Sequence, residues 1–207
     1  DRFVGHSVPA VAEVFREPEL SGRQWDYLHP FMDGAWCEDW LYPYWSDYAN
    51  PMGQRSVQLA AGKRFSKNGM TFIATAAYHN DGELETLLAY FLLVSQKQGT
   101  MVFQPMPILP NMPKEAGLSL AVLKQQVKEK ASLLQAPLGW AIEPLMHILC
   151  EEGRVVLRRR YTNGVVYANP EDKSPAHLNL GSSMQRVNGE KVGYIDLPPN
   201  SGVILYY

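Results

Sequence analysis

The feature that most constrains the fold is an alternation of strand-like and helix-like patterns between residues 31 and 104. Residues 31–38, 71–78 and 100–104 are short runs of mainly apolar or β-branched side chains, which are typical of buried strands. Residues 82–99 instead repeat apolar side chains at helical spacing, and one face consists of Leu84, Leu87, Leu88, Phe91 and Leu92. Strands that alternate with helices form parallel sheets. We therefore predict three neighbouring parallel strands with this helix packed outside them.

Other signals place the ends of helices. Asn80 and Glu83 have the spacing of a capping box at the start of the helix over 82–99, and Gly99 can close its far end. A modest helix is predicted over residues 52–66, and another around residues 117–134, after a proline-rich segment.

From about residue 153 the pattern changes to that of β-hairpins. The sequences "RVVLRRRY" and "VVYANP" meet across Thr162-Asn163-Gly164, and "SSMQRV" and "KVGYIDL" meet across Asn188-Gly189. A turn at residues 198–202 then leads into "VILYY". We predict that residues 151–207 form a small antiparallel β-sandwich domain, separate from an α/β domain over residues 1–150. The basic cluster Arg158–Arg160 is expected to be a solvated or paired face of this sheet.

The stretch "DGAWCEDWLYPYW", residues 33–45, places three acidic side chains and three tryptophans among thirteen residues. In a barrel of parallel strands, alternation would point Gly34, Trp36 and Glu38 inward, with Glu38 at the carboxyl end of its strand. Barrel enzymes hold their catalytic groups at that end. A carboxyl group among aromatic rings loses solvent, which raises its pKa and suits a general acid. Glu38 could alternatively be a salt-bridged carboxylate at the strand end, and Asp33 is expected to be a turn or cap residue.

Five further side chains are candidates for binding a substrate. Trp36 and Trp40 could stack on a sugar ring or belong to the core, and Asp39 could bind substrate or pair with an arginine. His79 follows the strand over 71–78, where contacts to a substrate are expected, whereas its neighbours are equally good helix caps. Gln104 ends the last strand and could bond a sugar hydroxyl. The aromatic and acidic character of this set favours a carbohydrate substrate.

Several segments resemble a known family. "MDGAWCEDW" resembles a strand end in poorly characterised glycosyl hydrolases with a (β/α)8 barrel, and "LLAYFLLVSQKQGTMVFQ" is similar to their late helix and last barrel strand. "LLQAPLGWA" resembles a segment that follows, while "RRRYTNGVVYANP" and "IDLPPNSGVILYY" resemble the opening and closing of their C-terminal β domain. These segments occur in the same order over about residues 28–207.

The resemblance implies a fold class and a missing part. Such a barrel has eight strands and about 250 residues, whereas this chain shows three strands after residue 30 and one more candidate before it. We therefore expect a partial (β/α) TIM-type barrel followed by the β domain, as in a fragment of a longer protein. A second catalytic carboxylate would then lie upstream of Asp1.

Composition narrows the classes of partner. The chain has 207 residues, 46% of them hydrophobic, and a formal net charge of −2 with scattered Lys and Arg, which indicates no nucleic-acid partner. No stretch reaches the ~18 apolar residues of a membrane helix. The two cysteines and five histidines lack the spacing of metal ligands, so we expect neither a metal nor another cofactor. The sequence leaves the oligomeric state and the localisation open, with a secreted or cell-surface location as one alternative.

Two functions from different classes follow from these patterns. The first is a glycoside hydrolase, or a fragment of one, with Glu38 as general acid/base. The second is a non-catalytic carbohydrate-binding or scaffold domain that keeps an aromatic cleft. A complete small α+β domain unrelated to barrels would leave the alternation of strands and helices unexplained.

Overall fold

The computed structural model describes residues 34–37, 40–41, 58–60, 62–64, 71–95, 101–107, 131–134, 137–171 and 173–207. Contacts divide the chain into two compact units. The first comprises Asp1–Ala77 and Val94–Pro105, and the second comprises Tyr78–Leu93 and Met106–Tyr207. The predicted domain boundary at residue 150 stays a prediction.

A small parallel sheet belongs to the first unit. Its strands are β1 (Gly34–Cys37), β2 (Thr71–Tyr78) and β3 (Met101–Pro107), in the order β1-β2-β3. β1 and β2 are parallel, with Gly34 opposite Thr71 and Cys37 opposite Ala74. The prediction that the three runs are neighbours in one sheet is confirmed, as is the parallel pairing of the first two. β3 extends to Pro107, beyond its predicted end at residue 104, because a strand at the end of the sheet order tolerates proline.

The core of this first unit forms around β2. Both faces of β2 are covered, since Phe72, Ala74 and Ala76 are fully buried and Thr75 is nearly so. Such burial is characteristic of strands in parallel sheets. Residues 58–60 and 62–64 are helical, as predicted for that part of residues 52–66. Gly62 allows this helix close to the core, because an added Cβ would lie 3.1 Å from Val94 Cγ2 and 3.4 Å from Trp40 Cη2.

Two helices are defined from end to end in the described parts of the chain. Helix α4 (Asp81–Val94) confirms the predicted helix and its start, but it ends at Val94, before the predicted end at Gly99, and Gly99 lies outside the described residues. Helix α6 (Ala131–Leu134) lies within the predicted range 117–134, of which the remainder lies outside the described residues. Burial in α4 goes beyond the predicted face and includes Ala89, Tyr90 and Leu93. The additional burial arises because α4 packs against the second sheet, which an alternation of strands and helices does not predict.

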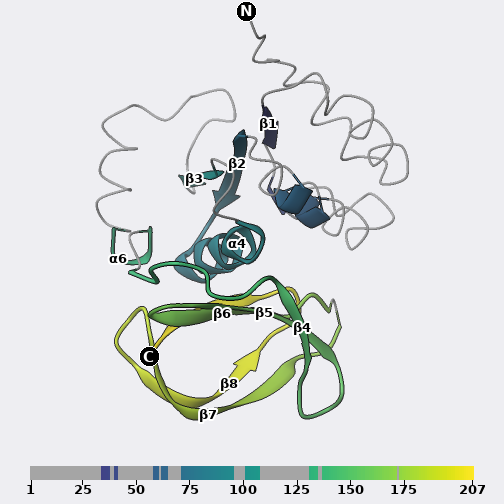
Figure 1. Cartoon of the computed structure of the whole chain (residues 1–207), viewed down its shortest axis with the longest axis vertical. Helices are drawn as coiled ribbons and strands as arrows, with labels where there is room; N and C mark the ends of the chain where they lie inside the picture. Colours follow the sequence, from purple (N-terminus) through teal and green to yellow (C-terminus); the bar gives the residue numbers. More distant parts are fainter. Residues whose placement is uncertain are drawn as a thin grey trace, which may run out of the picture. The chain divides into compact units, whose positions relative to one another are not determined.

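The second unit contains a six-stranded antiparallel sheet in the order β4-β5-β6-β9-β7-β8 (Figure 1). Its strands are β4 (Met146–Leu149), β5 (Val155–Tyr161), β6 (Gly164–Ala168), β7 (Ala176–Arg186), β8 (Lys191–Leu197) and β9 (Gly202–Tyr206). Both predicted hairpins are present, because β5 pairs with β6 around Thr162-Asn163 and β7 pairs with β8 around Asn188-Gly189. Gly189 has a φ of 90°, which a glycine adopts without strain.

This sheet is one continuous half-barrel instead of the two separate sheets of the predicted sandwich. The register between β7 and β8 shifts between Asn179 and Met184, and Gly181 inside that irregularity has a φ of 71°. Such a bulge bends its strand and increases the local twist. The curved sheet encloses an apolar core of Cys150, Val156, Val165, Tyr167, Ala176, Leu178, Met184, Ile195, Leu197, Val203 and Leu205.

The outer face of the same sheet carries helix α4 (Figure 1). Val166, Ala168 and Ile204 are fully buried although they alternate with the residues of the inner core. An added Cβ on Gly202 would lie only 2.7 Å from the Ala89 Cβ, so glycine permits the close approach of β9 to the helix. The predicted antiparallel β unit is confirmed, but it includes a helix layer.

Polar groups of β5 hold the last turn of α4. Arg159 Nη1 donates hydrogen bonds to the carbonyl oxygens of Leu92 and Leu93, at 3.1 and 3.3 Å, and the Tyr161 hydroxyl donates to Leu92 O at 2.6 Å. The last carbonyls of a helix have no partner within it, and they attract positive charge. Burial lowers the pKa of Arg159 and raises that of Tyr161 to about 12.

The first half of α4 caps the edge of β9. Ile204 N donates to Glu85 Oε1 at 3.0 Å, and Gly202 N donates to Thr86 Oγ1 at 3.2 Å. β7 pairs with β9 only at Leu205 and Tyr206, so it does not reach these two amides. The side chains of α4 therefore replace a missing strand.

Candidate functional site

The end of β2 and the start of α4 form a polar group that the sequence predicts. Asn80 Oδ1 accepts a hydrogen bond from Glu83 N at 3.0 Å, and Glu83 Oε2 accepts one from His79 N at 2.8 Å. Glu83 also contacts His79 Nδ1 at 3.0 Å and accepts a bond from Asn80 Nδ2 at 3.2 Å. This is a capping box extended by an imidazole, and it confirms the predicted cap at Asn80.

The electrostatics of this group favour an ionised carboxylate. Burial acts to raise the pKa of Glu83, but the hydrogen bonds from His79 and Asn80 outweigh it and hold the pKa below its ordinary value. His79 and Glu83 are both about half exposed. A carboxylate on Nδ1 fixes the orientation of the His79 ring, as it does for imidazoles that bind substrates or transfer protons.

Trp40 and Leu41, which follow Glu38 and Asp39, form an anchored turn in the first unit. Trp40 N donates to Thr75 O of β2 at 2.9 Å, and Leu41 N donates to Gln58 Oε1 at 2.6 Å. Leu41 has a φ of 56°, a strained conformation for a branched residue that the Gln58 bond helps to hold. The Trp40 ring is fully buried and meets Phe72 edge-on at 5.5 Å. The burial favours the core alternative for Trp40.

The other predicted site residues are described to different extents. Glu38 and Asp39, like Asp33, lie outside the described residues. Trp36 lies in β1 with only its backbone described, opposite Ile73 of β2. Gln104 is an exposed residue of β3. Their catalytic and binding roles stay predictions.

The basic cluster Arg158–Arg160 divides between the two faces of its strand. Arg158 Nε and Arg160 Nε bind Glu143 at 3.0 and 2.9 Å, whereas the buried Arg159 faces α4. Burial acts to raise the pKa of Glu143, but its bonds to the two arginines lower it overall. Arg158 and Arg160 therefore form the paired face that the sequence predicts, whereas Arg159 does not belong to it.

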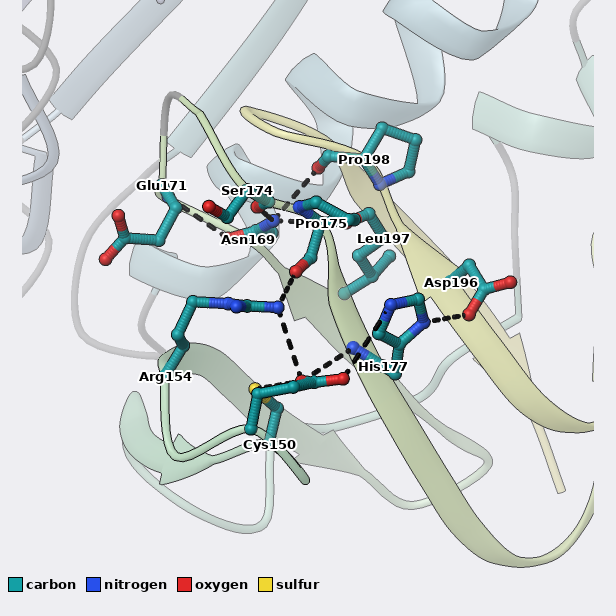
Figure 2. Close-up of polar contacts among 11 residues, drawn as sticks. Cys150, Arg154, Asn169, Glu171, Ser174, Pro175, His177, Asp196, Leu197 and Pro198 are labelled. Atoms are coloured by element: carbon teal, nitrogen blue, oxygen red, sulfur yellow. Dashed lines mark hydrogen bonds and ion pairs between the residues drawn. The ribbon is translucent and has the colours of Figure 1, made fainter.

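A second polar group, in the β unit, was not predicted (Figure 2). Asn169 is fully buried, and its Nδ2 donates to the carbonyl oxygens of Ser174, Leu197 and Pro198 at 2.9–3.2 Å. Asn169 Oδ1 accepts from Glu171 N at 3.1 Å, and its backbone oxygen accepts from the Tyr90 hydroxyl at 2.9 Å. The Asn169-Pro170 pair, at the end of "VVYANP", was the available sequence signal for this group. The arrangement makes Asn169 a structural connection between α4, β6 and β8.

Next to Asn169 lies a group with a thiol, an imidazole and carboxylates (Figure 2). It contains Cys150, Glu152, Arg154, His177 and Asp196.

No group of three or more histidine, cysteine, aspartate or glutamate side chains in the described parts of the chain could hold a metal ion. None of the helices that the structure describes is long and apolar enough to cross a membrane.

Comparison with known proteins gives only distant likenesses. No protein-family model matches the chain, and no curated protein matches it. An alpha-amylase from Lactobacillus plantarum is structurally similar over 87% of this chain and 48% of its own, with 15% sequence identity and a TM-score of 0.39. The chain thus spans about half the length of that amylase.

Proposed function

We propose that the chain is a glycoside hydrolase-like protein that acts on a poly- or oligosaccharide, with Glu38 as its general acid/base. The observation that carries the proposal is the parallel pairing of β1 with β2. β1 ends at Cys37, so Glu38 and Asp39 follow the carboxyl end of a parallel strand, and His79 follows the end of β2 in the same way. Parallel α/β folds place their catalytic groups after such strand ends.

The surroundings of these strand ends support a partial (β/α) TIM-type barrel. β2 is buried on both faces and is followed at once by α4, which is the order of a βα unit. The capping box holds His79 at the start of the helix. Trp36 precedes Glu38 by two residues in the sequence, which is the spacing of side chains that share one face of a strand. In this proposal Trp36, Asp39, His79 and Gln104 bind the sugar, and Trp40 supports the site from the core.

The six-stranded sheet has a supporting role in the proposal. It binds α4 at two places, at Glu85 and Thr86 and at Leu92 and Leu93. A helix fixed in this way provides a rigid base for the strand end that carries His79. Catalytic groups need such support, because a displacement of ~1 Å can reduce turnover about 10²-fold.

The test compares Glu38→Gln with wild type on a panel of soluble polysaccharides and aryl glycosides. Glu151→Gln is the matched control, since Glu151 is an exposed residue of the turn after β4. We expect release of reducing sugar by the wild type and by the control, and a loss of about 10²-fold or more in Glu38→Gln. Sugar binding, measured by titration calorimetry, should persist in all three. Turnover in Glu38→Gln equal to that of the control would contradict the assignment.

A non-catalytic carbohydrate-binding domain is the second candidate, and exposed rings on the β unit favour it. Trp140 is 68% exposed and Tyr207 is 60% exposed. Trp140 O accepts a hydrogen bond from Thr162 N, while Tyr207 N donates to Asn163 O, so the two residues flank the same turn. Flat aromatic side chains at a surface suit stacking on sugar rings. This candidate would be established if the wild type binds a glycan without hydrolysing it and if Trp140→Ala no longer binds that glycan. A wild type that neither binds nor hydrolyses any glycan of the panel excludes both.

A further inference from the structure

His177 of β7 lies between two acidic side chains that come from different parts of the sheet (Figure 2). Its Nδ1 binds the Asp196 carboxylate on β8, and its Nε2 lies 3.7 Å from Glu152 Oε1 in the turn between β4 and β5. Two further hydrogen bonds join the β4–β5 turn to β7, because the His177 amide donates to the Glu152 carboxylate at 3.5 Å and Glu151 N donates to His177 O at 3.3 Å. One imidazole therefore connects the β4–β5 turn with β7 and β8.

The protonation state of the imidazole decides how many of these side-chain contacts it can make. A neutral ring has one N–H donor, whereas an imidazolium ion has two and carries the charge that both carboxylates attract. Arg154 is the other basic group in the cluster. It lies 3.4 Å from Glu152 Oε2 and also donates to Pro175 O. Arg154 therefore continues to hold Glu152 when His177 is neutral, but it does not replace the bridge to β7.

The bridge covers a thiol. Cys150 directly follows β4, is buried in the apolar core, and donates a hydrogen bond from Sγ to Glu152 Oε2 at 3.0 Å. The turn that carries Glu152 also includes the bonds from Cys150 N to Arg154 O and from Gly153 N to Cys150 O, both at 2.9 Å. Release of this turn from β7 would therefore uncover Cys150, which is bonded to the turn through both its backbone and its thiol.

We propose that His177 is a pH-dependent clasp that, when protonated, fastens the β4–β5 turn to β7 and β8 and closes the sheet over the Cys150 thiol. The inference is independent of any carbohydrate activity. The bond to Asp196, with smaller contributions from Glu152, raises the pKa of His177 above its ordinary value, and the bond from Cys150 lowers that of Glu152. A histidine with a raised pKa stabilises the folded state at low pH. That contribution is lost as the pH rises from the ordinary value through the raised one.

The test measures the alkylation rate of Cys150 between pH 5 and pH 9 in the full chain, with Cys37→Ser as background. The sequence contains two cysteines, so Cys150 is then the sole thiol. The observable is the ratio of the rate in His177→Gln to the rate in the background chain at each pH. Ionisation of the thiol cancels in this ratio, which leaves the difference in local opening. We expect a ratio of about two- to fivefold at low pH, the size of a partly exposed ion pair, and a ratio near one at high pH.

Two further variants distinguish a clasp from general loosening. When Asp196→Asn is present in both chains of the ratio, the pH midpoint of the ratio should move to lower values, because the change removes the main cause of the raised pKa of His177. His147→Gln alters an exposed histidine of β4 in the same sheet and should leave the profile unchanged. A ratio that does not vary with pH would overturn the proposal, as would an unmoved midpoint in Asp196→Asn.

Discussion

The two faces of the six-stranded sheet are both buried, but they are held by different interactions. The inner face closes on aliphatic side chains such as Val165, Val203 and Leu205. The outer face packs against α4 and adds a buried arginine, two tyrosine hydroxyls and side-chain caps on the edge of β9. Apolar packing is tolerant of small shifts, whereas hydrogen bonds to specific carbonyls and amides are not. The comparison indicates that the inner face supplies burial, and that the outer face also fixes one orientation of the helix.

The largest expected effect comes from removing the buried cation on the outer face. Arg159→Ala leaves the Leu93 carbonyl without this donor and Leu92 O with only the Tyr161 hydroxyl, so the free energy of unfolding should fall by about 2–4 kcal/mol. Arg160→Ala is the matched control, since the Arg160 side chain is 51% exposed and should cost less than about 1 kcal/mol. Urea unfolding followed by circular dichroism measures both. Equal losses would mean that Arg159 does not anchor the helix.

A pair of adjacent valines compares the two faces at constant chemistry. Val165 points into the inner core, whereas Val166 points toward α4, and both are essentially fully buried. If the helix completes a second core, Val165→Ala and Val166→Ala should each cost about 1–2 kcal/mol in the same unfolding experiment. A cost near zero for Val166→Ala would show that the outer face is not a packed interface in solution.

Tyr90→Phe tests a single polar contact between the helix and the sheet. The change removes the hydroxyl that donates to Asn169 O at 2.9 Å but keeps the ring. The net value of one such hydrogen bond is about 0.5–1.5 kcal/mol. A thermal unfolding midpoint lower by roughly 2–4 °C is expected. An unchanged midpoint would show that the hydroxyl contributes nothing to the interface.

Glu85→Gln should stabilise the protein slightly at neutral pH. Burial raises the pKa of Glu85 despite the bond from Ile204 N and the positive charge of Arg186. An acid with a raised pKa favours the folded state only when protonated, so its contribution to stability falls as the pH rises from its ordinary value through the raised one. Glutamine keeps the acceptor and resembles the protonated form. The unfolding midpoint of the variant should exceed that of wild type at pH 7 and approach it near pH 4; the reverse order would contradict the assigned burial.

The sequence predicted those parts of the fold that depend on short-range patterns. The hairpins follow from Asn163-Gly164 and Asn188-Gly189, and the capping box from Asn80 and Glu83. The docking of α4 on the sheet could not be predicted, because its contacts join residues more than 60 positions apart, such as Arg159 and Leu92. The apolar pattern of a helix in a βα unit does not indicate that the helix also packs against a second sheet.

The candidate site was predictable only in part, for a related reason. The partners of His177 depend on the register of β7 and β8, and Gln185 pairs with Lys191 near the turn. A regular continuation from that pair would put Asp196 opposite Leu180, but the bulge puts it opposite His177. No local pattern indicates a three-residue shift. Glu38 remains the prediction on which the proposed activity depends, and it lies outside the described residues.

Amide hydrogen exchange at Ile204 tests most directly whether α4 is an integral layer of the β unit. The Ile204 and Gly202 amides lie on a part of β9 that β7 does not reach, and their bonds go to Glu85 and Thr86. We predict slow exchange at Ile204, comparable with that at Val203, which faces β6, and a large acceleration at Ile204 in Glu85→Ala. The account would be contradicted if, in the wild type, the Ile204 and Gly202 amides exchanged as fast as those of an unfolded peptide.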